Sequence, residues 1–176
     1  MPTIPIPSRT IPWIVLAATL ATLGGAFFFQ YGLGLEPCAL CYTQRNPYYA
    51  ALPVALLAGL SAREANIGLV PLALMGALAL IFAVSTGLGV YHAGVEYGFW
   101  EGPSACAGGP AFPGSIADLQ AALEGEAQVV RCDQVPWSFL GISLAGYNVL
   151  ISLALMGLSL VPLIRAWTQT GVEDDL

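Results

Sequence analysis

Four long apolar stretches dominate the sequence and limit the folds that it can adopt. They cover residues 11–29, 48–60, 67–91 and 139–164. About 20 residues of α-helix, rising about 1.5 Å each, cross the roughly 30 Å hydrocarbon core of a bilayer. Because lipid offers no hydrogen bonds to the backbone, each stretch is expected to satisfy its own polar groups as a helix. The sequence therefore predicts an all-α integral membrane protein that forms a four-transmembrane-helix bundle.

The composition agrees with a membrane setting. Of the 176 residues, 57% are hydrophobic and only 9% are charged, whereas a soluble domain has about 25% charged residues. Eleven acidic residues against five arginines give a net charge of -6, so no basic patch is available to neutralise phosphates and nucleic acid is not expected as a partner. We expect residues 1–176 to form a single membrane domain surrounded by membrane lipid.

The expected spans leave one long polar loop between the third and the fourth. The spans are predicted at residues 11–31, 42–61, 67–91 and 139–165, and the loop at residues 92–138. The first span is expected to be an uncleaved helix rather than a signal peptide, because its apolar run is long and no small-residue cleavage site follows. Within the loop, Ser115 and Asp118 have the capping-box spacing of a short amphipathic helix. That helix could lie on the membrane surface or pack on the loop itself.

The arginines predict the orientation in the membrane. Four spans place both termini on one side, where Arg9, Arg63 and Arg165 would lie, and leave Arg45 and Arg131 on the other. Cytoplasmic loops carry an excess of basic residues, so both termini are expected to be cytoplasmic. The cysteines and the long loop would then face the outer, oxidising compartment in which disulfides persist.

The four cysteines carry the most specific chemistry. Cys38 and Cys41 form a Cys-x-x-Cys pair at the start of the second span, whereas Cys106 and Cys132 lie far apart in the loop. A zinc site more commonly shows two close pairs, so no metal is expected. Two structural disulfides are the main alternative. A disulfide across so short a ring stabilises a fold little, however, which favours a pair that exchanges electrons.

Two further residues could assist the redox pair. Arg45 follows Cys41 by one helical turn, and a permanent cation near a membrane span is costly. It could snorkel to the interface or pair with Glu36; alternatively, it could lower the pKa of the Cys41 thiol and favour the nucleophilic thiolate. His92 could donate a hydrogen bond to a bound acceptor or could simply be solvated. Because Pro47 interrupts the segment, the cysteine pair could lie on a helix or in a turn.

The electron acceptor is expected to be a membrane quinone. The sequence contains no glycine-rich dinucleotide fingerprint and no Cys-x-x-Cys-His haem attachment motif, and the single histidine cannot supply bis-histidine haem ligation. A quinone dissolves in lipid and accepts the two electrons that a dithiol releases. Many aromatic residues gather on the side of the cysteines, although most of them are expected to belong to the interfacial belt.

These features together resemble the DsbB family of bacterial inner-membrane oxidoreductases. The resemblance rests on the sequence Glu-Pro-Cys-Ala-Leu-Cys at residues 36–41, on Arg45, on the two loop cysteines and on Trp-Ser-Phe-Leu-Gly at residues 137–141. The family reoxidises DsbA, a periplasmic thioredoxin-fold dithiol oxidase, by means of quinone. A quinone-dependent enzyme similar to vitamin K epoxide reductase and a non-catalytic membrane scaffold remain the alternatives.

The resemblance also implies roles for individual residues. Cys106 would form the mixed disulfide with a DsbA-like partner, and Cys132 would be its loop partner. Cys41 would be the thiolate beside the quinone, and Cys38 the other half of that pair. Arg45 and His92 fall where the family contacts quinone, which would be ubiquinone, with menaquinone as the alternative. The implied location is the bacterial inner membrane, with the cysteines facing the periplasm.

Overall fold

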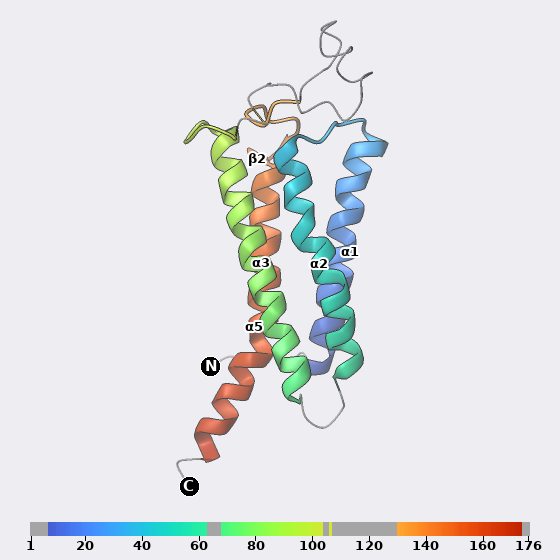
Figure 1. Ribbon diagram of the computed structural model, residues 1–176, viewed down its shortest axis with the longest axis vertical. Coiled ribbons are helices and arrows are strands. Elements are labelled where there is room, and N and C mark those ends of the chain that lie inside the picture. Colours follow the sequence, from blue (N-terminus) through green and yellow to red (C-terminus); the bar gives the residue numbers. More distant parts are fainter. Residues whose placement is uncertain (1–6, 63–67, 104–105, 107–129, 174–176) are drawn as a thin grey trace, which may run out of the picture.

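The computed structural model describes residues 7–62, 68–103, 106 and 130–173 and is mainly helical (Figure 1). Its elements, in chain order, are η1 (Ser8–Thr10), α1 (Ile11–Phe27), η2 (Phe28–Gly32), α2 (Ala39–Ser61), α3 (Leu69–Glu96), β1 (Ser138–Phe139), β2 (Ile142–Ser143) and α5 (Leu144–Glu173). The four long helices lie side by side and alternate in direction, and α5 extends beyond the others at its far end. The predicted helical class is confirmed.

The four long helices pack around a shared apolar core. Helix α3 contacts both α2 and α5, while α1 contacts α2 and closes the bundle against α5. The core is formed by buried side chains from all four helices, including Ile11, Val15, Tyr48, Phe82 and Leu155. Large apolar side chains also cover the outside, among them Leu60, Leu80 and Ile164. A helix that is apolar on all sides is typical of a lipid environment.

Among the residues that the structure describes, three helical segments are long and apolar enough to cross a membrane: Ser8–Gly32, Leu69–Glu96 and Leu144–Thr168. Helix α2 is not among them, although its 23 residues would extend about 35 Å at about 1.5 Å per residue. Its first half contains polar residues, including Gln44, Arg45 and Asn46, which lower its hydropathy. A fourth span therefore stays a prediction. The helix predicted near Ser115 lies outside the described residues.

Helix α2 begins at the cysteine pair and passes through both of its prolines. Cys38 is the N-cap residue, and its Sγ accepts a hydrogen bond from the backbone N–H of Cys41 at 3.3 Å. The helix continues through Pro47 and Pro53 without ending. The structure thus settles the question that the sequence left open: Cys41 lies in the first turn of a helix, with Cys38 at its cap.

Several boundaries differ from the expected spans, among them the end of the third and the start of the fourth. Helix α3 ends at Glu96 rather than at residue 91, so His92 lies inside the helix and not in the loop. Helix α5 begins at Leu144, because a short antiparallel hairpin with the pairs Ser138–Ser143 and Phe139–Ile142 precedes it. The two residues between its strands both have positive φ, which matches the twist that a two-residue hairpin requires.

The contact between α3 and α5 yields a first prediction. A Cβ added at Gly89 would lie 2.9 Å from Cγ2 and 3.3 Å from the backbone nitrogen of Val149. Gly89→Ala is therefore expected to force the helices apart and to lower stability by about 1–3 kcal/mol. Gly87→Ala is the matched control, because a Cβ there meets nothing within 4 Å. Thermal unfolding in detergent would compare the two, and equal melting temperatures would contradict the prediction.

Candidate functional site

All four cysteines meet at one end of the bundle, where the start of α2 faces the last turns of α3. Cys38 is buried, with 5% of its surface exposed, and Cys41 is partly buried. Both are free thiols, and their sulfur atoms lie 2.9 Å apart in a hydrogen bond. Cys106 and Cys132, 26 residues apart in sequence, are joined in a disulfide and are buried beside Cys38.

The two cysteine pairs approach each other through Cys38 and Cys132. The sulfur atoms of these two residues and a ring nitrogen of His92 all lie within 4.8 Å of one another. Three such ligand atoms could hold a metal ion only if the disulfide were reduced, because Cys132 is bonded to Cys106. The arrangement suits attack of one sulfur on the other pair, which is the elementary step of thiol–disulfide exchange.

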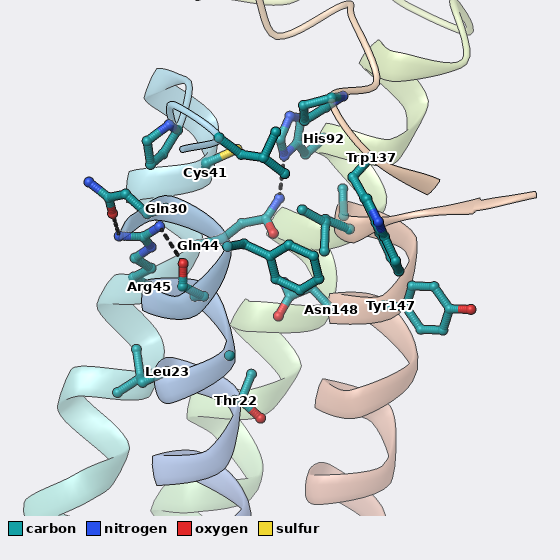
Figure 2. Close-up of a pocket in the computed structure, with 18 of the residues that line it drawn as sticks. Thr22, Leu23, Gln30, Cys41, Gln44, Arg45, His92, Trp137, Tyr147 and Asn148 are labelled. Atoms are coloured by element: carbon teal, nitrogen blue, oxygen red, sulfur yellow. Dashed lines mark hydrogen bonds between the residues drawn. The ribbon is translucent and has the colours of Figure 1, made fainter. Parts of the chain in front are cut away.

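His92 lies at the centre of a buried polar cluster. It is 3% exposed, and its Nε2 atom lies 3.5 Å from Cys38 Sγ. Its Nδ1 atom lies 2.7 Å from Nε2 of Gln44, a contact that Figure 2 shows. On the other side, Oε1 of Glu96 lies 3.8 Å from Nε2 of the ring. The histidine therefore contacts the redox pair directly, a contact that the sequence did not indicate.

Gln44 and Glu96 were not selected from the sequence as site residues. Glu96 follows His92 by four residues, a spacing that places two side chains on the same face of a helix. That signal depends on the helix continuing past His92, and the sequence predicted that it ends near residue 91. Gln44 is buried on α2, but a single glutamine in a polar stretch carries no distinctive pattern.

Arg45 is turned toward α1. The residue is 9% exposed, its Nη1 donates to Oε1 of Gln30 at 2.6 Å, and its Nη2 donates to the carbonyl of Ala26 at 3.5 Å. Figure 2 shows both bonds. The guanidinium also lies 5.3 Å from the ring centre of Phe27 and 5.2 Å from that of Tyr42. These contacts hold a cation in a partly apolar site through hydrogen bonds and cation–π attraction.

The expectation that Arg45 favours a thiolate at Cys41 is corrected by this geometry. The thiol whose pKa is lowered, to about 4, is that of Cys38. The hydrogen bond with the Cys41 side chain is the largest cause; desolvation by burial opposes the shift, and the hydrogen bond and charge of His92 add to it. Helical spacing places Arg45 one turn beyond Cys41, but its long side chain reaches α1 instead.

A cavity of about 620 Å³ opens between the helices beside Cys41. Its walls are mostly apolar and come from α1, α2, α3, α5 and the segment before α5. Its polar lining includes Cys41, Gln44, Arg45, His92 and Asn148. Trp137, which packs against Phe29, Phe139 and Tyr147, lies at its rim (Figure 2). An apolar cavity with a few polar groups is typical of a small-molecule site.

A second cavity of about 450 Å³ lies on the other side of the thiols. It is bordered by Cys38 and by residues on both sides of Cys132 in the chain, and the residues common to both cavities are Cys41, His92, Glu96 and Pro136. The redox pair thus separates a mostly apolar cavity within the bundle from a more polar one beside the loop disulfide. Electrons that enter from the disulfide could leave toward the apolar cavity.

The fold and the site define a membrane-type helical bundle with two neighbouring cysteine pairs suited to thiol–disulfide exchange. The family model described as "Disulfide bond formation protein DsbB" matches residues 8–162 of the chain. The protein therefore belongs to the DsbB family.

Curated relatives agree with this assignment. A protein named "Disulfide bond formation protein B" from Polaromonas sp. is 32% identical over 165 residues, which cover 89% of this chain and 91% of the relative. A protein of the same name from Albidiferax ferrireducens is 34% identical, and the match covers 85% of this chain and 87% of the relative. Another, from Acidovorax sp., is 31% identical, and the match covers 96% of this chain and 93% of the relative. No solved structure matches the chain significantly. The family name supports a role in disulfide bond formation.

Proposed function

We propose that this protein reoxidises a DsbA-like periplasmic dithiol oxidase by disulfide exchange and passes the electrons to membrane quinone. The observation that carries the proposal is the contact between the two cysteine pairs, with the sulfur atoms of Cys38 and Cys132 within 4.8 Å of each other. Family membership supports the same role. A purely structural disulfide would need no free thiol pair beside it, which argues against an inert scaffold.

The relay follows from the chemistry of exchange. A thiolate of the reduced partner attacks Cys106, the bond between Cys106 and Cys132 breaks, and Cys132 leaves as a thiolate. Cys132 then attacks Cys38 of an oxidised Cys38–Cys41 pair, and Cys41 leaves as a thiolate. The partner's second thiolate then attacks the partner sulfur of the mixed disulfide, so that the partner departs with a disulfide and Cys106 leaves as a thiolate. Cys106 attacks Cys132, which re-forms the loop disulfide and releases Cys38, and the two electrons rest on the Cys38–Cys41 pair. Each step exchanges one sulfur–sulfur bond for another.

The cavity beside Cys41 has the chemistry expected of a quinone site. Its apolar walls would hold an aromatic ring and part of a lipid tail, while N–H groups of Arg45, His92 and Gln44 could donate hydrogen bonds to ring oxygens. When bound, ubiquinone, or menaquinone in its place, supplies an acceptor for two electrons and two protons. Cys41 would be the thiol at this cavity, and Arg45 and His92 would orient the acceptor.

We propose that α2 is a fourth span, so that the chain crosses the bacterial inner membrane four times. Arg9, Arg63 and Arg165 would then lie at the cytoplasmic side with both termini, as basic residues near spans tend to do. The cysteine end of the bundle would face the periplasm. There, the second cavity would be accessible to a soluble partner, while the first would communicate with lipid.

The proposal predicts coupled oxidation of a protein dithiol and reduction of quinone. Purified protein in detergent, mixed with reduced DsbA and ubiquinone-1, is expected to consume both at a ratio of one to one, because each disulfide formed releases two electrons. Thiol titration would count the dithiols, and ultraviolet absorbance would follow the quinone. Dithiol oxidation that does not depend on quinone would contradict the electron acceptor, and absence of oxidation would contradict the function. A reaction with quinone but not with a thioredoxin-fold dithiol would favour the alternative related to vitamin K epoxide reductase.

A further inference from the structure

A chain of buried polar side chains connects α5 to the redox pair. The Oγ atom of Ser143, just before α5, donates to Oε2 of Glu96 on α3. Oε1 of Glu96 lies 3.8 Å from Nε2 of His92, and the same ring nitrogen lies 3.5 Å from Cys38 Sγ. Glu96 also lines both cavities. The carboxylate and the thiol therefore face the same nitrogen of the histidine.

The carboxylate of Glu96 is held in a fixed orientation. Its side chain is 2% exposed, and burying a carboxylate is costly unless partners satisfy it. The Oγ of Ser143 accepts the backbone N–H of Gly146 at 3.1 Å, so its own hydrogen remains for Glu96. One carboxylate oxygen is thus occupied by Ser143, and the other is left to face His92.

The other ring nitrogen can be satisfied in either protonation state of His92. Nδ1 lies 2.7 Å from the side-chain amide nitrogen of Gln44. An amide can turn to present either its NH₂ group or its carbonyl oxygen. The NH₂ group would donate to a bare Nδ1, and the carbonyl would accept from a protonated one. His92 can therefore take up a second proton without losing this contact, and that proton would lie beside a carboxylate.

We propose that Glu96 is a positioning residue for exchange at Cys38: it holds the His92 ring against the sulfur and stabilises the imidazolium that forms when His92 takes the thiol proton. The inference rests on the proposed exchange function. In the step that starts from the observed bonds, Cys38 passes its proton to His92 and its sulfur attacks Cys132. The Cys38–Cys132 bond forms, the Cys106–Cys132 bond breaks, and Cys106 leaves with the electron pair as a thiolate. In the reverse step, Cys106 re-forms its bond with Cys132, and Cys38 recovers the proton from His92.

Other titratable groups border the same two cavities and belong to the electrostatic surroundings of this pair. They are Cys41, Arg45 and Tyr48 of α2, Glu36 before α2, Arg131 of the loop and Tyr147 of α5. Arg131 is exposed and paired with Asp133 at 2.9 Å, and Arg45 is bonded to Gln30 of η2 and to Ala26 of α1. Among the described residues, Glu96 is therefore the charged group that contacts His92 directly.

The test measures the reactivity of Cys38 alone, with no quinone and no partner. In full-length protein with Cys41, Cys106 and Cys132 replaced by Ser, Cys38 is the single thiol, and its rate of alkylation by iodoacetamide is followed against pH in detergent. Thiolate is the reactive form. Glu96→Gln is expected to raise the midpoint of this profile by about one pH unit, since a charge in contact shifts a titration by one to three units. Glu96→Asp, which keeps the charge but shortens its reach, is expected to raise it by less.

Two controls separate this role from a structural one. Glu101→Gln makes the same change at an exposed position and is expected to leave the midpoint in place. In a His92→Asn background, Glu96→Gln is expected to cause no rise, because the carboxylate acts through the ring. An unchanged or lowered midpoint for Glu96→Gln with His92 present would overturn the proposal. If that variant does not fold, absence of a rise in Glu96→Asp would overturn it equally. Because the assay contains no quinone or partner, its failure would leave the proposed function standing.

Discussion

Replacing Cys38 by Ser is expected to limit the protein to a single turnover. The Cys106–Cys132 disulfide does not involve Cys38, so the variant is expected to oxidise one equivalent of a reduced DsbA-like partner. Without Cys38, the thiolate of Cys132 has no sulfur to attack, and the electrons remain in the loop. The steady-state rate is expected to fall on the order of a thousandfold or more, as it does when a nucleophile is removed. Quenching with an alkylating reagent and counting modified thiols would show one equivalent oxidised, followed by a plateau.

Two other variants serve as controls for that plateau. Cys106→Ser removes the disulfide itself and is expected to abolish even the first equivalent. Thr43→Ser alters an exposed residue one turn along α2 and is expected to keep full turnover. Continued oxidation by Cys38→Ser beyond the first equivalent, at a rate near that of the unmodified protein, would show that electrons bypass Cys38 and would contradict the relay.

The helical bundle and the redox pair could be predicted from the sequence because lipid and sulfur chemistry leave few alternatives. A long apolar segment in lipid has to be helical, and Cys-x-x-Cys is a specific signal. The end of α3 was less predictable. The sequence becomes polar at His92, but Gly94 leaves space for the indole of Trp100, which folds back against the helix. The Nε1 atom of Trp100 donates to the carbonyl of Tyr91 at 2.8 Å, and the helix continues to Glu96.

The contacts within the site depend on packing between helices, which spacing along one helix does not contain. The position of Arg45 relative to Cys41 on α2 indicated a contact between them, but the guanidinium is bonded to Gln30 of η2, which follows α1. Likewise, Glu96 is held by Ser143, which lies 47 residues later in the chain. Each of these pairings is decided by which helices are neighbours, and the apolar pattern of a membrane helix is too uniform to specify that.

Arg45→Leu is expected to weaken the use of quinone while leaving exchange between the cysteine pairs intact. Leucine keeps much of the volume but removes a cation on the cavity wall, and a hydrogen bond to a charged group contributes about 1.5–3 kcal/mol. The quinone concentration that gives half of the maximal rate is therefore expected to rise at least about tenfold. The first equivalent of dithiol oxidised in the absence of quinone is expected to form at an unchanged rate, because Arg45 does not contact the loop disulfide. Steady-state rates over a range of ubiquinone-1 concentrations, with stopped-flow measurement of the first turnover, would separate the two effects.

The chain offers a matched control for the loss of charge. Arg131 is exposed and bonded to Asp133 beside the second cavity, so Arg131→Leu is expected to leave the dependence on quinone unchanged. Arg45→Lys keeps the charge but cannot reproduce the planar fork that reaches both Gln30 and Ala26, and an intermediate weakening is expected. Unfolding would lower both measured rates together, whereas loss of a binding contact changes only the quinone dependence. An unchanged dependence in Arg45→Leu would place the quinone away from this arginine and would leave the hydrogen bonds to Gln30 and Ala26, which join α2 to η2 and α1, as its only function.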